Sequence, residues 1–184
     1  EGNRGTEIKG KIIGILGYGN MGQSFAKKIS GFDATVITYD KYRSNYGDQY
    51  AKAVDLSTLQ KQSDILTIHI PYAESNHHFI DAHFLDQFQK NIYLINTARG
   101  LILNTADLVE RIKSGKVLGA GLDVLEYEEQ SFDDWHFKNL PAPFEYLCQS
   151  DRAVLSPHIA GWSFESKIGH ARVLGEKIIA HFNL

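Results

Sequence analysis

The sequence has little cysteine, little excess charge and no long apolar run. Cys148 is the single cysteine among 184 residues, so no disulfide can form within the chain and we expect a reducing, cytoplasmic compartment. No apolar stretch approaches the roughly 20 residues that span a membrane, and the N-terminal stretch lacks the apolar centre of a signal peptide. A net charge of -3 leaves no basic stripe for nucleic acid, and we expect no bound metal. These shortages predict a globular domain with neither a membrane nor a nucleic acid as partner.

Short apolar runs rich in β-branched residues alternate with amphipathic stretches of helical length. This alternation is typical of an α/β protein with a doubly wound, mainly parallel sheet and helices on both faces. The pattern predicts strands at Lys11–Leu16, Ala34–Tyr39, Ala51–Val54, Ile65–Ile70, Ile92–Asn96, Val117–Asp123 and Ala153–Ser156. It predicts helices at Met21–Ile29, Leu56–Gln62, Ala82–Phe88, Thr105–Ser114 and Glu165–Phe182.

The segment Glu129–Gln149 is the least regular part of the chain. It holds many aromatic residues and shows no clear period. We expect either a surface excursion that packs on its own rings or part of a contact between subunits.

Glycine, proline and ionisable residues stand where the predicted strands end. In an open parallel sheet these ends share one edge, and ligands bind in the crevice outside it. The residues concerned are Gly17, Gly19, Gly22, Asp40, Pro71, Thr97–Gly100, Glu126–Glu129 and His158. The sequence therefore predicts that one site gathers residues that lie far apart in the chain.

The first of these clusters is "GYGNMGQSFA", which closes a predicted strand and opens a predicted helix. Its G-x-G-x-x-G spacing, followed by an acid at Asp40, is typical of the dinucleotide-binding turn of a Rossmann fold. Gly17 would make the tight turn, Gly19 would admit a pyrophosphate, and Gly22 would let helix and strand approach closely. The phosphates would meet the N–H groups at the start of the helix. Three glycines that serve only a tight turn are the plainer alternative.

Asp40 ends the second predicted strand. Its carboxylate can accept hydrogen bonds from the adenosine ribose and would repel a 2′-phosphate, so NAD is expected rather than NADP. Lys41 and Arg43 follow closely and could soften that preference. The alternative for Asp40 is a helix cap or a solvated loop acid.

Five stretches occur in order across nearly the whole chain: "KGKIIGILGYGNMG", "HIPYAESNHHFID", "LINTARG", "GAGLDVLEYE" and "SPHIAGWS". In them the sequence resembles the D-isomer-specific 2-hydroxyacid dehydrogenases, and among these the phosphoglycerate dehydrogenase-like enzymes. The resemblance implies an NAD-dependent oxidoreductase that interconverts a D-2-hydroxy acid and a 2-keto acid, with 3-phosphoglycerate as a candidate substrate. It also implies that residues 1–184 are the NAD(P)-binding Rossmann domain and that the family's substrate-facing domain is absent from this chain.

Reduction of a 2-keto acid requires a cation for the carboxylate and an acid for the carbonyl oxygen. Arg99 suits the first role because its planar fork can hold a carboxylate bidentately, although a surface ion pair at a strand end is the plainer alternative. His158 suits the second role because imidazole titrates near neutral pH. Pro157 and Gly161 would hold its loop in a fixed turn.

Further roles follow from the resemblance alone. It implies that Glu128 orients His158, a choice that the residues by themselves leave open between Glu128, Glu126 and Glu129. It places Asp123 near the nicotinamide end of the cofactor. It also lines the cofactor path with Asn20, Met21, Ile70, Pro71, Thr97, Ala98 and His158, with Pro71 and His69 on the adenosine side. The other histidines are interpreted as structural.

The resemblance further implies a homodimer, and we expect the aromatic segment Phe132–Tyr146 to form the contact. Two alternatives for function stay open. One is an NAD-sensing, corepressor-like interaction module, since such proteins use the same fold and keep the same Arg, Glu and His. The other is a purely structural Rossmann domain.

Overall fold

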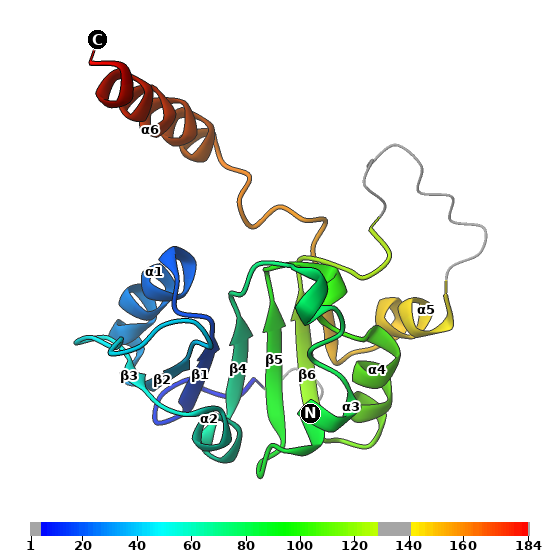
Figure 1. Ribbon diagram of the computed structural model, residues 1–184. Coiled ribbons are helices and arrows are strands. Elements are labelled where there is room, and N and C mark those ends of the chain that lie inside the picture. Colours follow the sequence, from blue (N-terminus) through cyan, green and yellow to red (C-terminus); the bar gives the residue numbers. More distant parts are fainter. Residues whose placement is uncertain (1–4, 129–140, 184) are drawn as a thin grey trace.

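The computed structural model describes residues 5–128 and 141–183 and is built on one parallel sheet (Figure 1). The seven strands of the described chain lie in the order β3-β2-β1-β4-β5-β6-β7. They are β1 (Ile12–Leu16), β2 (Thr35–Tyr39), β3 (Lys52–Ala53), β4 (Ile65–Ile68), β5 (Ile92–Asn96), β6 (Val117–Leu122) and β7 (Ala153–Leu155). Every strand predicted from the sequence is present, and the doubly wound α/β fold is confirmed.

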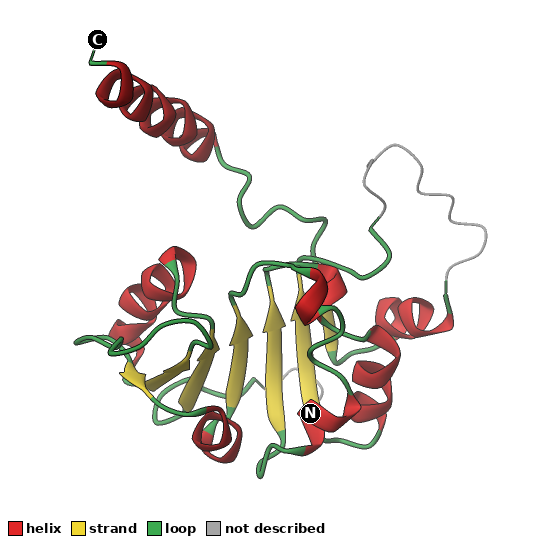
Figure 2. Cartoon of the chain, viewed as in Figure 1, coloured by secondary structure: helices red, strands yellow, loops and turns green. Residues whose placement is uncertain are grey.

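Helices connect and flank these strands (Figure 2). They are α1 (Asn20–Ile29), α2 (Leu56–Gln62), α3 (Ala82–Asp86), α4 (Thr105–Lys113), α5 (Ala142–Gln149) and α6 (Phe164–Phe182). The five predicted helices are confirmed. The start of α4 illustrates a local cause of helix formation. The Asn104 side chain accepts a hydrogen bond from the Asp107 N–H and so caps the helix.

The strand order places helices on both faces of the sheet. The chain leaves β1 in one direction, through α1 to β2, and then runs in the other direction from β3 through β4, β5 and β6 to β7. Because such crossovers are right-handed, α1 covers one face and α2 to α5 cover the other. The larger core cluster, with Leu66, Ile92, Leu94 and Leu122, lies under this second group, and a smaller cluster lies under α1. This arrangement leaves the carboxyl edge of the sheet open between the two layers.

The expectation of irregular structure throughout Glu129–Gln149 is wrong for the part that is described. Residues 142–149 form α5, which begins directly after Pro141. Proline fits there because the first helical N–H groups have no partner within the helix. Phe144 and Leu147 turn into the core, so tertiary packing stabilises a helix whose sequence has no clear period.

The described aromatic residues of the expected dimer contact Phe132–Tyr146 pack within this chain and are not free to form a contact with a second copy. Phe144 is 5% exposed and lies edge-on to the ring of Tyr127, with 6.2 Å between ring centroids. Tyr146 is also partly buried against the same core. Residues 132–140 lie outside the described residues.

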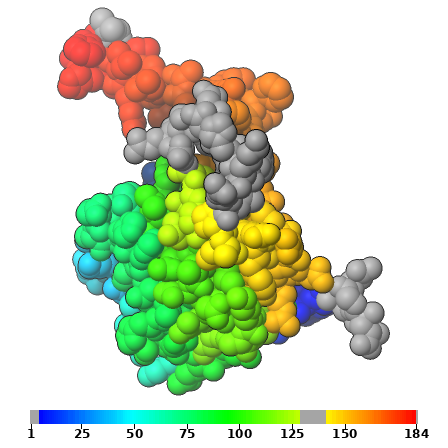
Figure 3. Space-filling model, turned by 90° about the vertical axis from the view of Figure 1, so that its right-hand side faces the viewer, coloured from blue at the N-terminus to red at the C-terminus, as the bar shows by residue number. Residues whose placement is uncertain are grey.

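Helix α6 stands apart from the sheet. Figures 1 and 3 show it projecting beyond the carboxyl edge, and none of its residues is buried. Its exposed apolar side chains are Phe164, Ile168, Val173, Leu174, Ile178, Ile179 and Phe182. No helix in the described residues is long and apolar enough to cross a membrane.

Candidate active site at the carboxyl edge of the sheet

The segments that follow the strands surround a cleft of about 660 Å³. Its lining includes Gly19, Asn20, Met21, Ile70, Pro71, Thr97, Ala98, Arg99 and Glu128. An adjoining cavity of about 180 Å³ is lined by Gly17, Gly19, Asp40, Lys41, Ile70 and Pro71, among others. Glu128 and His158 also line a third cavity of about 250 Å³. The fold therefore brings these residues to one edge, whereas Gly22 and Asp123 line none of the three cavities.

The glycine turn between β1 and α1 is tight, and this excludes larger residues. Gly17 has a φ of +94° and its N–H donates to the Tyr39 carbonyl at 2.8 Å. A side chain there would collide with Ile70, and one at Gly22 would collide with the Gly17 carbonyl. Gly19, in contrast, faces open space. The first turn of α1 has no side-chain cap, so its N–H groups are available to an anion such as a pyrophosphate.

Asp40 stands at the end of β2 with a fixed carboxylate. One oxygen accepts a hydrogen bond from the Tyr18 N–H at 2.8 Å, and the other accepts from the Tyr42 N–H at 2.9 Å. No helix begins in residues 41–51, so Asp40 is not a helix cap. The carboxylate lines the smaller cavity beside the glycine turn.

The loop that carries Arg99 is held by Asn96, a fully buried residue at the end of β5. Its Oδ1 accepts from the Ala98 N–H at 3.0 Å, and its Nδ2 donates to the Arg99 carbonyl at 3.1 Å. The Arg99 side chain is exposed, and its Nη1 donates to the Ala98 carbonyl at 2.6 Å. Within the described part of the chain Arg99 forms no ion pair, which argues against the surface ion pair considered above.

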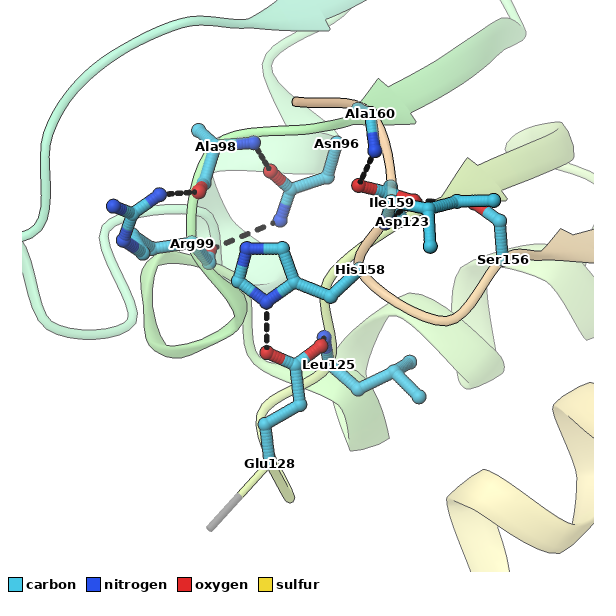
Figure 4. A network of polar contacts seen from close by, with 10 residues as sticks. All are labelled: Asn96, Ala98, Arg99, Asp123, Leu125, Glu128, Ser156, His158, Ile159 and Ala160. Carbon is cyan, nitrogen blue, oxygen red and sulfur yellow. Dashed lines mark hydrogen bonds and ion pairs between the residues drawn. The ribbon is translucent and has the colours of Figure 1, made fainter. Parts of the chain in front are cut away.

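His158 and Glu128 lie in contact, although 30 residues separate them. His158 Nδ1 is 2.9 Å from Glu128 Oε2, and the other Glu128 oxygen accepts from the Leu125 N–H at 2.8 Å (Figure 4). Both side chains are largely shielded, with 31% and 19% of their surface exposed. The carboxylate is thereby fixed against one ring nitrogen and sets the orientation of the imidazole.

Glu126, the neighbour that sequence reasoning could not separate from Glu128, has other partners. Its Oε1 lies 3.1 Å from His78 Nε2, and its Oε2 accepts from the Thr105 N–H at 2.8 Å. Glu129 lies outside the described residues. Of the described glutamates at this turn, Glu128 is therefore the one that touches His158.

Asp123 holds the His158 loop. Its carboxylate accepts hydrogen bonds from the Ser156 hydroxyl at 2.6 Å, the Ile159 N–H at 2.9 Å and the Ala160 N–H at 2.8 Å. Burial acts to raise the pKa of Asp123, but these bonds outweigh it and lower the pKa. His158 adopts a left-handed backbone with φ of +52°, which a non-glycine residue keeps only when its surroundings impose it.

His69 lines both the main cleft and the smaller cavity. Burial lowers its pKa to about 4, and its Nε2 lies 3.0 Å from the Thr67 hydroxyl. The ring therefore stays neutral at physiological pH and shapes the wall of the site.

Sequence reasoning missed several residues that hold this site together. Asn96, Ser156 and Tyr18 each fix a loop through hydrogen bonds, and none was a candidate. For Asn96 and Ser156 the available signal was a polar residue at the end of an apolar strand, which must find partners because burial without them is costly. In the described part of the chain no cluster of His, Cys, Asp and Glu could hold a metal.

Comparison with known proteins gives a consistent set of matches. A family model described as "D-isomer specific 2-hydroxyacid dehydrogenase, NAD binding domain" matches residues 1–160. The chain is 35% identical over 178 residues to a glyoxylate reductase of Thermococcus litoralis, covering 96% of this chain and 50% of that protein. It is 34% identical over 181 residues to a hydroxypyruvate reductase of Thermotoga maritima, and the match covers 98% of this chain and 56% of that protein.

Solved structures give the same match. A D-isomer specific 2-hydroxyacid dehydrogenase from Lactobacillus delbrueckii ssp. bulgaricus, in its NAD-complexed form, has a TM-score of 0.85 at 28% identity, covering 96% of this chain and 55% of that one. The chain thus spans about half the length of the relatives that it matches.

Proposed function

Because the chain belongs to the D-isomer specific 2-hydroxyacid dehydrogenase family, we propose that it is the cofactor-binding part of an NAD-dependent enzyme that interconverts a D-2-hydroxy acid and a 2-keto acid. Relatives are named for glyoxylate and hydroxypyruvate, so small 2-keto acids are the substrate class that we favour. 3-Phosphoglycerate is a narrower candidate within the same chemistry.

The residues at the carboxyl edge fit NAD, whose nicotinamide supplies the hydride acceptor or donor. The uncapped start of α1 would bind the pyrophosphate, and open space at Gly19 would let it approach the backbone. Asp40 would accept from the ribose hydroxyls, which favours NAD over NADP. We assign the path between them to Asn20, Met21, Ile70, Pro71, Thr97 and Ala98.

Arg99 would bind the substrate carboxylate. It lines the main cleft, and within residues 5–128 and 141–183 its guanidinium makes one hydrogen bond, to the carbonyl of its neighbour Ala98. A carboxylate would be the stronger acceptor, because two parallel hydrogen bonds to a charged group would replace one bond to a neutral carbonyl. Asn96 would keep the backbone of this loop in place while the side chain moves.

His158 would protonate the carbonyl oxygen as reduction proceeds, and would take the proton back in the reverse reaction. The observation that carries this proposal is the 2.9 Å contact between His158 Nδ1 and Glu128 Oε2. With Nδ1 directed at a carboxylate, Nε2 is the ring nitrogen that can face a substrate. Glu128 would compensate the charge of the protonated ring. We assign Asp123 to holding this loop beside the nicotinamide.

A substrate-facing domain would complete the site, and two observations support this proposal. The chain spans half the length of its relatives, and the apolar side chains of α6 are exposed. Without such a cover Arg99 would hold the substrate in an open, wet cleft, where charge interactions are weak. We therefore expect the 184-residue chain to bind NADH but to reduce 2-keto acids poorly. Association of two copies remains part of the proposal and is tested by sedimentation at micromolar concentration.

The experiment is turnover by the natural-length protein that contains this sequence, followed by NADH absorbance with glyoxylate, hydroxypyruvate, pyruvate and phosphohydroxypyruvate. His158→Ala should lower kcat by on the order of a hundredfold or more and leave NADH binding within about twofold. Arg99→Ala should chiefly raise KM for the keto acid. His83→Ala, on exposed surface of α3, is the matched control. NADH binding without turnover of any keto acid would favour the corepressor-like alternative and refute the enzyme assignment.

A further inference from the structure

Tyr18, between the first two glycines of the turn, is fastened to the segment after β2 by all three of its polar groups. Its N–H donates to Asp40 Oδ2 at 2.8 Å, and its hydroxyl donates to Asp48 Oδ1 at 2.9 Å. Its carbonyl accepts a hydrogen bond from Arg43 Nη1. The side chain is 1% exposed, so the phenol points into the protein and not into the cofactor cleft.

The Asp48 end of this connection is itself fixed. The same Oδ1 also accepts from the Tyr50 N–H at 2.7 Å and from the Ala51 N–H at 3.1 Å. Burial acts to raise the pKa of Asp48, but the bonds from Tyr50, Tyr18 and Ala51 lower it overall. Burial and the same contact with Asp48 raise the pKa of the Tyr18 hydroxyl, so the phenol stays protonated and donates.

Arg43 is committed to the glycine turn. The Tyr18 carbonyl that accepts from its guanidinium also accepts from Gln23 Nε2 at 3.1 Å, so both lone pairs of that oxygen are used. The cavity beside Asp40 is lined by Lys41 but not by Arg43. A cation placed three residues after Asp40 invites the interpretation that it binds a 2′-phosphate, and the hydrogen bond to the Tyr18 carbonyl argues against this.

We propose that Arg43, with Tyr18 and Asp48, positions the glycine turn and the Asp40 carboxylate for the cofactor, and that Arg43 is not a ligand of a 2′-phosphate. The inference rests on the proposed NAD-binding function. If Arg43 fixes the turn that every dinucleotide must contact, its loss lowers the affinity for NADH and for NADPH by the same factor. If Arg43 were a phosphate ligand, its loss would lower the affinity for NADPH alone. Lys41 is the cation that lines the cavity, so the loss of Lys41 should lower the affinity for NADPH in particular.

The test compares Arg43→Ala with the matched control Lys41→Ala in the 184-residue chain, by fluorescence titration with NADH and by competition with NADPH. Arg43→Ala should raise both dissociation constants by on the order of tenfold, with their ratio unchanged within about twofold. Lys41→Ala should weaken NADPH binding by a larger factor than NADH binding, so that the ratio of the two dissociation constants changes. Both substitutions are repeated in an Asp40→Asn background. There the carboxylate no longer repels the 2′-phosphate, so the dissociation constants for NADH and NADPH are both measurable.

Two results would overturn the proposal: a loss confined to NADPH in Arg43→Ala, or no change with either cofactor. If the unaltered chain binds neither cofactor, the proposed function fails instead, so the two failures are distinguishable.

The Asp48 end provides an independent comparison. Asp48→Ala and Tyr18→Phe should each weaken NADH several-fold, whereas Asp48→Asn, which keeps the accepting oxygen, should bind like the unaltered chain. Circular dichroism melting identifies any variant that does not fold. Because Asp48→Ala and Asp48→Asn differ in whether residue 48 keeps an accepting oxygen, this pair decides the matter even if Tyr18→Phe is unfolded. Equal NADH affinity in Asp48→Ala and Asp48→Asn contradicts the positioning role.

Discussion

His69 carries the clearest pH dependence among the residues of the site. Burial lowers the pKa of its imidazole from 6.5 to about 4 in the folded chain. The unfolded chain therefore binds this proton first as the pH falls, and His69 destabilises the fold progressively between about pH 6.5 and pH 4. Well above pH 6.5 the ring is neutral in both states and contributes no pH dependence.

We predict that His69→Gln removes this contribution. From pH 7 to pH 5 the free energy of unfolding should fall by about 2 kcal/mol less in the variant than in the unaltered chain. Urea denaturation at both pH values measures it, and His83→Gln, exposed on α3, controls for histidine titration in general. Parallel pH profiles for His69→Gln and the unaltered chain would mean that the ring is not buried as described.

At the scale of elements, the segment after β7 depends on Asp123 at the end of β6. Three donors from residues 156–160 converge on this one carboxylate, and they hold the strained backbone of His158. A hydrogen bond to a charged group contributes about 1.5 to 3 kcal/mol to the free energy of unfolding. Removing the carboxylate also leaves its donors without a partner, which destabilises the fold further.

We predict that Asp123→Ala lowers the free energy of unfolding by about 3 kcal/mol or more and that Asp123→Asn lowers it by less. The amide oxygen of asparagine still accepts, but its NH₂ group faces a donor. Urea denaturation gives the stability, and hydrogen exchange at the Ile159 and Ala160 amides reports the loop itself. Unchanged protection of these two amides in Asp123→Ala would contradict the account. Glu110→Ala, at an exposed position of α4, is the control.

The elements themselves were largely predictable. β1 and β4 are apolar runs that are buried along nearly their whole length, and such runs read plainly in a sequence. β5 and β6 alternate buried and more exposed positions, but their β-branched and aliphatic residues still mark them as strands. α5 was not predictable, because its stability comes from packing Phe144 and Leu147 into the core and not from a visible period. A helix that tertiary contacts create leaves only a weak pattern in the chain.

At the scale of the whole molecule, the predicted topology located the site at one edge of the sheet. It did not predict which side chains contact one another there. Strand ends share an edge, so Gly19, Arg99 and Glu128 could be expected around one cleft. The choice of Glu128 as the partner of His158 came from family resemblance, since three glutamates stand within four positions. The roles of Tyr18 and Asn96 in holding loops depend on loop paths that no periodicity encodes.

The central claim is that the carboxyl edge of this sheet binds NAD. The most direct measurement is a titration of the 184-residue chain with NADH and NADPH, followed by quenching of tryptophan fluorescence or by calorimetry. We predict saturable binding of one NADH per chain and binding of NADPH weaker by on the order of tenfold or more, because the Asp40 carboxylate lines the cavity that we propose for the ribose and would repel a 2′-phosphate. Absence of saturable NADH binding, or NADPH binding as tight as NADH, would contradict it.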